Sequence, residues 1–247
     1  MMAHSFHAGL SAAAVIDIWE QGAGRHPLDQ ALLLLRHACP DELFETLCEW
    51  TVGKRDARLL AARSSTFGDC IEGYAACPVC GNGLEFELSC EGLLRLASTT
   101  DSTWHKVEQA GYSWDLRGPN SRDLAAAVAA PDVSRARRVI LSRCIRNGTA
   151  TTDACDWTDE LQAALAARLS ELDPLAEILI DLRCAACGHA WQTVFDIANF
   201  FWNEIHLRSR RLLQEVDLLA RIYGWTESEI LGMTDQRRDL YVGMALS

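Results

Sequence analysis

The sequence predicts an α+β protein that is mainly helical, with one small antiparallel β element built from two distant Cys-x-x-Cys hairpins. Two cysteine pairs, Cys77 with Cys80 and Cys184 with Cys187, are each followed directly by glycine. Most other segments show the apolar spacing of amphipathic helices. The chain has 247 residues and is 49% hydrophobic, which is enough to bury an ordinary core.

The segments around the two cysteine pairs match. "IEGYAA" and "LEFEL" flank the first pair, and "AEILIDLR" and "AWQTVFDI" flank the second, so that each half reads strand, turn, strand. Zinc in structural sites prefers four ligands in a tetrahedron, and a Cys-x-x-Cys turn presents two thiolates to one ion. We therefore predict one shared zinc-ribbon-like site, with Cys77, Cys80, Cys184 and Cys187 as its ligands and one structural zinc ion.

Other interpretations of the cysteines stay open. The pairs could be separate thiol pairs with redox or structural roles, or they could bind another metal. His189 lies beside the second pair, but four thiolates already complete the site, so we expect it to support the site or lie at the surface. Six further cysteines occur singly and are expected to be small buried side chains: Cys39, Cys48, Cys70, Cys90, Cys144 and Cys155.

The remaining sequence divides into helical regions around the two cysteine-containing halves. We expect five regions: N-terminal helices in residues 1–70, the first half of the zinc ribbon in 71–100, an inserted helical module in 101–173, the second half in 174–198, and C-terminal helices in 199–247. Within the insert, "YSWDLRGPN" predicts a strand and "IRNGTATTDACDW" a loop. Thr226 and Glu229 form a predicted capping box at the start of a short helix after Gly224.

Composition and motifs disfavour several classes of function. The net charge of −11 and the pI of about 5.1 argue against general binding to nucleic acid or anionic membranes. No apolar run approaches the roughly 20 residues needed to cross a bilayer, and the N-terminal segment lacks the cationic start of an export signal. Nucleotide-binding loops and the usual hydrolase motifs are absent from the sequence, so we expect no enzyme.

Two arginine clusters keep a nucleic-acid alternative open. They are "RARR" at residues 135–138 and "RSRR" at residues 208–211, both on predicted amphipathic helices. Arginines beside an apolar stripe normally face solvent or pair with acidic residues. A zinc-ribbon nucleic-acid-binding protein is therefore one alternative function, and a redox-regulated zinc-dependent chaperone is another.

Several segments together resemble a known family. "CPVCGNGLEF", "LRCAACGHAW", "FDIANFFWNEI", "RRLLQEVDLLARIYGWTESEIL" and "RRDLYVGM" resemble the T-even phage baseplate hub and assembly-chaperone family, in the form found in gene clusters for extracellular contractile injection systems. The resemblance is strongest from Ala176 to Met244. It implies a non-enzymatic protein that helps assemble a contractile tail baseplate, either as a hub component or as a helper.

The resemblance also implies partners and contact residues. The expected partners are protein components of the baseplate or spike, with no membrane, and nucleic acid is disfavoured. The expected location is the bacterial cytoplasm or a phage-tail-like particle. The terminal motif, with the aromatic cluster near residue 200, supplies the candidate partner-binding residues Trp202, Tyr223, Trp225, Arg237, Arg238 and Tyr241. We expect Trp225 and Ile230 to pack at a sharp corner between helices, with the arginines on the outer face.

Overall fold

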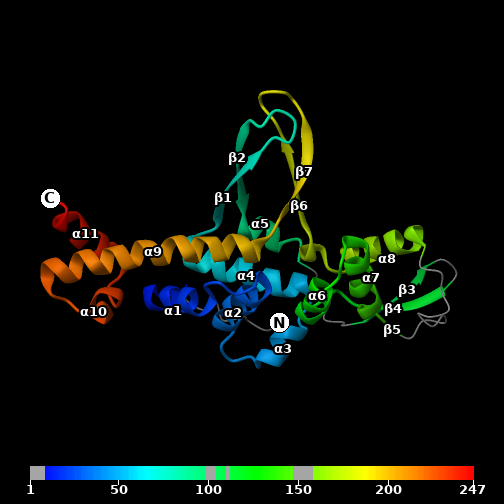
Figure 1. Ribbon diagram of the computed structural model, residues 1–247, viewed down its shortest axis with the longest axis horizontal. Coiled ribbons are helices and arrows are strands. Elements are labelled where there is room, and N and C mark those ends of the chain that lie inside the picture. The colour runs from blue at the N-terminus through cyan, green and yellow to red at the C-terminus, as the bar shows by residue number, and fades with distance from the viewer. Residues whose placement is uncertain (1–8, 98–103, 110–111, 147–157) are drawn as a thin grey trace.

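The computed structural model confirms a mainly helical protein with small antiparallel sheets, and it describes residues 9–97, 104–109, 112–146 and 158–247 (Figure 1). An elongated helical body runs the length of the molecule. Two β-hairpins rise from its middle, next to each other, and their tips meet. The inserted module lies at one end of the body and the C-terminal helices lie at the other.

The body is built from the N-terminal helices and the longest helix of the chain. They are α1 (Ala12–Gly22), α2 (Pro27–Ala38), α3 (Phe44–Glu49), α4 (Val52–Phe67) and α9 (Ile197–Tyr223). Ser11 caps α1 and Thr51 caps α4, whereas α2 begins with Pro27, whose fixed φ and missing N–H suit the first position of a helix. The apolar faces of α1, α2, α4 and α9 form the main core, in which Ile18, Leu35 and Phe201 are fully buried.

Each cysteine pair lies at the tip of an antiparallel hairpin. The first hairpin joins β1 (Cys70–Ala76) to β2 (Gly83–Ser89), and the second joins β6 (Ile178–Arg183) to β7 (Ala190–Phe195). At their bases, Ile71 pairs with Leu88 and Ile178 with Phe195; Ile71, Ile178 and Phe195 belong to the main core, and the partly buried Leu88 packs against it. Since strand residues alternate between faces, this seats one face of each hairpin on the body.

Arg63 fixes the base of the first hairpin. Its buried guanidinium donates from Nη1 to the carbonyl oxygens of Gly68 and Cys70, both at 2.7 Å. Nε and Nη2 of the same side chain bind the two carboxylate oxygens of Glu204 at 3.0 and 2.6 Å. Because Arg63 belongs to α4 and Glu204 to α9, one side chain joins the hairpin to two helices of the body.

The inserted module has helices, as predicted, and the predicted strand in "YSWDLRGPN" is the middle strand of a three-stranded sheet whose other two strands were not predicted. The chain leaves the first hairpin through α5 (Cys90–Leu94) and then forms β3 (His105–Gln109), β4 (Tyr112–Leu116), α6 (Ser121–Val128), α7 (Val133–Arg143), β5 (Ile145–Arg146), α8 (Asp159–Leu172) and the short 3-10 helix η1 (Pro174–Ala176). The strand order is β3-β4-β5. Trp114 and Leu116 of β4 pack with Leu141 and Leu165 in a second core. Most of the predicted loop, residues 147–157, lies outside the described residues.

A polar junction attaches the insert to the body. Oδ2 of Asp173 accepts a hydrogen bond from the backbone N–H of Gly53 at 2.9 Å, in the first turn of α4. The N–H of Val52 donates to the carbonyl oxygen of Pro119 at 2.7 Å, and Thr51 and Asn120 form an isolated β-bridge. The start of α4 is thus bound by two separate parts of the insert, the turn before α6 and the residue after α8.

The C-terminal arm comprises the end of α9, α10 (Glu227–Leu231) and α11 (Asp235–Ala245). Gly224 ends α9 with φ of +70°, a left-handed conformation that glycine adopts without strain. The predicted capping box is confirmed, because Thr226 and Glu229 exchange side-chain to backbone hydrogen bonds at the start of α10. Both helices fold back against α9 (Figure 1).

Candidate metal centre

The two hairpin tips have the same backbone geometry. In the first, the N–H of Gly81 donates to the carbonyl of Cys77 at 2.9 Å, and in the second, the N–H of Gly188 donates to Cys184 at 2.9 Å. Gly81 and Gly188 have φ of +71° and +74°, which explains why glycine follows the second cysteine of each pair. Two segments more than 100 residues apart therefore form equivalent turns, and each presents two thiols.

The four sulfur atoms of the tips form one cluster. Sγ of Cys77 lies 3.7 Å from Sγ of Cys187, and Sγ of Cys80 lies 3.6 Å from Sγ of Cys184. All four sulfurs lie within 4.8 Å of one another. The predicted meeting of the two hairpins is therefore confirmed, and the cluster could hold a metal ion.

The distances between sulfurs fit a metal ion better than disulfide bonds. A disulfide requires about 2.05 Å between its sulfurs, far less than the 3.6 and 3.7 Å found here. A tetrahedron with metal–sulfur bonds of about 2.3 Å has sulfurs about 3.8 Å apart on each edge. A closed set of four protein ligands would leave no position on the ion for substrate or activated water.

The surroundings of the four thiols give them different pKa values. The backbone amides of Cys187 and Ala186 donate toward Cys184 and lower its pKa to about 7. The amide of His189 favours the thiolate of Cys187, but desolvation and the sulfurs of Cys80 and Cys184 outweigh it and raise this pKa to about 12. Crowded thiolates repel one another, so all four ionise together only beside a cation.

His189 and the single cysteines lie outside the cluster. The imidazole of His189 stacks on Trp191 with the ring centroids 6.0 Å apart, a supporting position beside the tip. Cys39, Cys48, Cys90 and Cys144 are buried, as predicted. Cys70 is exposed, which corrects the prediction: it begins β1 on the outward side, while the adjacent Ile71 points into the core. Cys155 lies outside the described residues.

Three of the candidate partner-binding residues form an aromatic cluster at the corner between α9 and α11. Trp225 stacks on Tyr223 at 4.5 Å between ring centroids and meets the ring of Tyr241 nearly at right angles at 4.8 Å. Such contacts leave no space for a ligand between the rings. Trp202 is elsewhere: it is buried in the main core, where its ring packs on Gly22 of α1.

The two candidate arginines of α11 differ from each other. Arg237 is exposed, and its guanidinium lies over the ring of Tyr241 at 5.7 Å. Arg238 is fully buried, which corrects the expectation that both arginines lie on the outer face. Its Nε donates to Glu215 at 2.7 Å, Nη1 donates to the carbonyl of Met233, and Nη2 pairs with Asp235. One residue along an α-helix corresponds to a rotation of about 100°, which turns Arg238 toward α9 while Arg237 faces outward.

The two arginine clusters also differ. Arg208 and Arg211 of α9 pair with Glu215, and they reach Asp235 and Asp239 of α11, so much of their charge is neutralised within the arm. Among the described residues, no ion pair involves Arg135, Arg137 or Arg138 of α7, and these three are exposed. The cluster on the insert is therefore, within the described part of the chain, the one whose three arginines are all exposed and without ion pairs.

Sequence reasoning did not predict the polar residues that position the hairpins and the insert. Arg63, Glu204 and Asp173 are the clearest examples, since each is buried or partly buried and joins distant segments. A charged residue on the apolar face of a predicted helix is the sequence feature that could have indicated such a buried polar contact. Arg63 gives that signal, because it lies one turn after the buried Leu59 and Leu60.

Comparison with known proteins identifies no relative. No protein-family model matches the chain, and no curated protein or solved structure is significantly similar to it. Within the residues described, no helix is both long and apolar enough to traverse a bilayer.

Proposed function

We propose that the protein is a non-enzymatic assembly protein whose shape is fixed by one structural zinc ion and whose C-terminal arm binds a protein partner. The ligands of the zinc are Cys77, Cys80, Cys184 and Cys187. Four sulfur ligands with near-tetrahedral spacing suit zinc, which combines a preference for thiolates with tetrahedral geometry. The function of the ion is to hold the two hairpin tips together.

The observation that carries the partner-binding role is the apolar surface of the C-terminal arm. Leu240 and Met244 are 64% and 58% exposed, and they are four residues apart on α11, so they share one face. Ile222 and Leu246 are also exposed on this arm. Large apolar side chains that gather at the surface commonly mark protein interfaces. Their neighbours, Tyr223, Trp225 and Tyr241, pack into a rigid aromatic support.

The proposed partner is a baseplate or spike component of a contractile phage-tail-like system. The likeness of residues 176–244 to the baseplate hub and assembly-chaperone family supports this partner, and the apolar surface belongs to the same part of the chain. An assembly role needs a stable surface rather than a reacting group. The closed set of sulfur ligands agrees with that requirement.

Co-expression with the baseplate and spike genes of the native gene cluster tests this proposal. We expect the tagged protein to retain a baseplate or spike component, identified by mass spectrometry. The variant Leu240→Asp/Met244→Asp should lose this component. A matched control, Leu43→Asp/Leu96→Asp, places the same charges at exposed leucines of other regions and should retain it.

Two results would contradict the assembly role. One is that the wild-type protein retains no baseplate or spike component. The other is that deletion of its gene leaves the number and structure of assembled particles unchanged. Equal binding by the Leu240→Asp/Met244→Asp variant and the wild type would remove the arm as the docking surface.

A further inference from the structure

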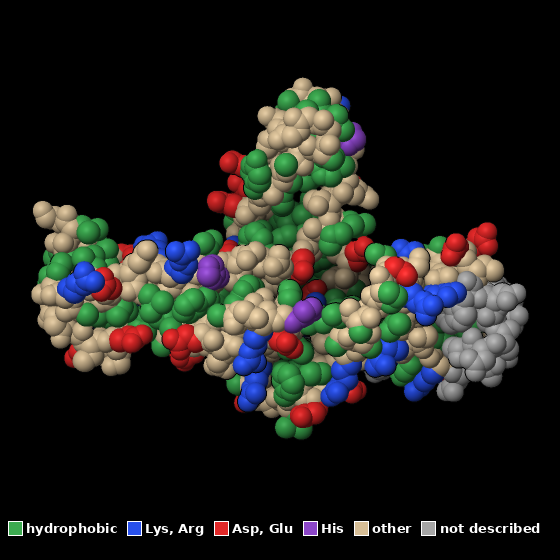
Figure 2. Space-filling model, in the orientation of Figure 1, with side chains coloured by type: hydrophobic (Ala, Val, Ile, Leu, Met, Phe, Trp, Pro, Cys, Tyr) green, Lys and Arg blue, Asp and Glu red, His purple; other side chains and the backbone are tan. Residues whose placement is uncertain are grey.

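The inserted module carries a basic surface on an acidic protein. Residues 117–146 contain seven arginines and two aspartates, with no lysine or glutamate, whereas the whole chain has a net charge of −11. Figure 2 shows Lys and Arg side chains gathered over the region of α6 and α7. This separation of charge is local, and the apolar arm lies at the opposite end of the body (Figure 1).

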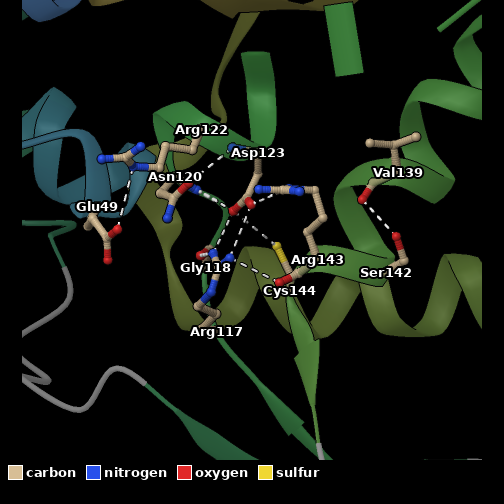
Figure 3. Close-up of polar contacts among 10 residues, drawn as sticks. All are labelled: Glu49, Arg117, Gly118, Asn120, Arg122, Asp123, Val139, Ser142, Arg143 and Cys144. Atoms are coloured by element: carbon tan, nitrogen blue, oxygen red, sulfur yellow. Dashed lines mark hydrogen bonds and ion pairs between the residues drawn. The ribbon is translucent and has the colours of Figure 1, made fainter. Parts of the chain in front are cut away.

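A buried aspartate neutralises two of the seven arginines. Asp123 is fully buried and caps α6 together with Asn120. Its carboxylate accepts hydrogen bonds from Arg117 Nη1 at 2.5 Å and from Arg143 Nε at 2.8 Å (Figure 3). Desolvation opposes ionisation of Asp123, but the hydrogen bonds and the arginine charges outweigh it and lower the pKa of this carboxyl. Arg117 and Arg143 are thus structural, since they connect the end of β4 and the end of α7 to α6.

Two other arginines are partly engaged. Arg122 of α6 pairs with Glu49 of α3 at 3.4 Å, also drawn in Figure 3. The guanidinium of Arg146 lies over the ring of Trp104 at 4.0 Å. Both contacts are near the surface, where such pairs are weak and remain exchangeable.

The remaining three arginines lie on α7 in an unfavourable electrostatic setting. Arg135 and Arg138 are three residues apart, so their like charges share one helix face and repel each other. Arg135 is also the third residue of α7, where the partial positive charge of the helix N-terminus disfavours a cation; the carboxylate of Asp132, which accepts from the N–H of Arg135 at 2.7 Å, offsets part of that charge. Arg208 and Arg211 of α9 have the same spacing, but Glu215 lies beside them. A partner with negative charge would relieve the repulsion among the arginines of α7.

We infer that the exposed face of α7, formed by Arg135, Arg137 and Arg138, is a docking surface for an acidic segment of a partner protein. Val133, in the first turn of the same helix, is 79% exposed, and an apolar side chain among the arginines favours a protein surface over a phosphate backbone. Long nucleic acids would also meet the acidic remainder of the chain, while a short acidic segment meets mainly the local positive field.

This surface is separate from the apolar arm, and the inference does not depend on the proposed assembly role. Its test uses the full chain and two probes of equal charge: a labelled helical peptide with glutamates along one face, and a short DNA duplex. Binding is followed by fluorescence anisotropy at low and moderate salt. The test variant is Arg135→Glu/Arg138→Glu. The control, Arg25→Glu/Arg210→Glu, makes the same change in net charge at two other exposed arginines without ion pairs among the described residues.

We expect the peptide to bind the wild-type protein and to lose about tenfold or more in affinity on the test variant, since two charge-assisted contacts are removed. The control should stay within about twofold of wild type, well under the roughly 1.4 kcal/mol that a tenfold change represents. The thermal midpoint of the test variant should equal or exceed that of wild type, because a glutamate in the first turn of α7 would interact favourably with the helix N-terminus. A merely structural role for these arginines predicts a lower midpoint.

Four outcomes would overturn the inference. They are absence of peptide binding, equal loss in the test and control variants, tighter binding of DNA than of peptide, and a wild-type self-association that the test variant abolishes. The third would make nucleic acid the partner, and the fourth would make it a second copy of this chain. The wild-type sedimentation profile distinguishes the fourth from the others.

Discussion

Arg238 and Glu215 form an ion pair inside the C-terminal arm, with Arg238 Nε 2.7 Å from Glu215 Oε2 and both side chains buried. The pair joins α11 to α9. A buried ion pair adds modest net stability, but removal of one partner leaves a buried charge with fewer partners: Glu215 would keep only Arg208 and Arg211. The geometry of the arm therefore depends on both residues being present.

Replacement of Arg238 by alanine should destabilise the arm by about 1–3 kcal/mol, because Glu215 loses its buried hydrogen-bond donor while Arg208 and Arg211 still pair with it. Chemical denaturation monitored by tryptophan fluorescence measures this loss. The control Arg237→Ala removes an exposed neighbour and should change stability by no more than about 0.5 kcal/mol. The double variant Arg238→Met/Glu215→Leu should recover much of the loss. Equal effects of the two single variants would contradict burial of Arg238.

Replacement of Cys77 or Cys184 by serine should remove the zinc. Three remaining thiolates bind the ion more weakly, and the binding energy that clamps the tips, about 10 kcal/mol or more for such sites, largely disappears. Metal analysis of freshly purified, reduced protein gives the zinc content, and thermal unfolding gives the stability. The control Cys70→Ser changes an exposed cysteine outside the cluster and should keep one zinc per chain. Wild-type protein without zinc would exclude the proposed ion.

Replacement of Gly188 by alanine should weaken the second hairpin tip. Alanine at a φ of +74° costs about 1–2 kcal/mol, and the amides that face Cys184 would shift. Zinc affinity measured by competition with a chelator should fall about tenfold. Gly243 supplies the opposite control: it lies inside α11 with open space beside it, so Gly243→Ala should raise stability by up to about 1 kcal/mol. An unchanged zinc affinity for Gly188→Ala would show that the turn tolerates a side chain.

The pH dependence of the free energy of unfolding should reveal the raised pKa of Asp56. Desolvation raises its pKa to about 6, against the opposing effect of Arg55. Since the folded protein binds this proton more tightly than the unfolded chain, the contribution is present below about pH 4 and is lost as the pH rises to about 6. Asp56→Asn should therefore gain stability relative to wild type over this interval. Denaturation curves from about pH 4 to 7 measure the difference, and a constant or falling difference would refute the shift.

The hairpins were the most predictable part of the fold. Cys77, Cys80, Cys184 and Cys187 share spacing, following glycine and strand-like flanks, and each of these features has a local physical cause. The meeting of the tips is not local, but two half-sites require each other to complete a tetrahedron. Chemistry thus supplied a contact across more than 100 residues.

Packing details were less predictable for a physical reason. Arg238 differs from Arg237 by one residue, and the direction of α11 against α9 decides which one is buried. β3 and β5 are short, and their pairing depends on Trp114 and Leu116 finding a core made by α7 and α8. Such elements form through tertiary contacts that no short stretch of sequence specifies.

The separation of the hairpin tips along the chain also determines when the four cysteines can come together during synthesis. Cys80 leaves the ribosome 104 residues before Cys184, an interval of about 5–20 s at an elongation rate of roughly 5–20 residues per second. Throughout that interval the nascent chain contains only Cys77 and Cys80, two of the four sulfur ligands. The four-sulfur cluster can therefore form only after the whole insert has been translated.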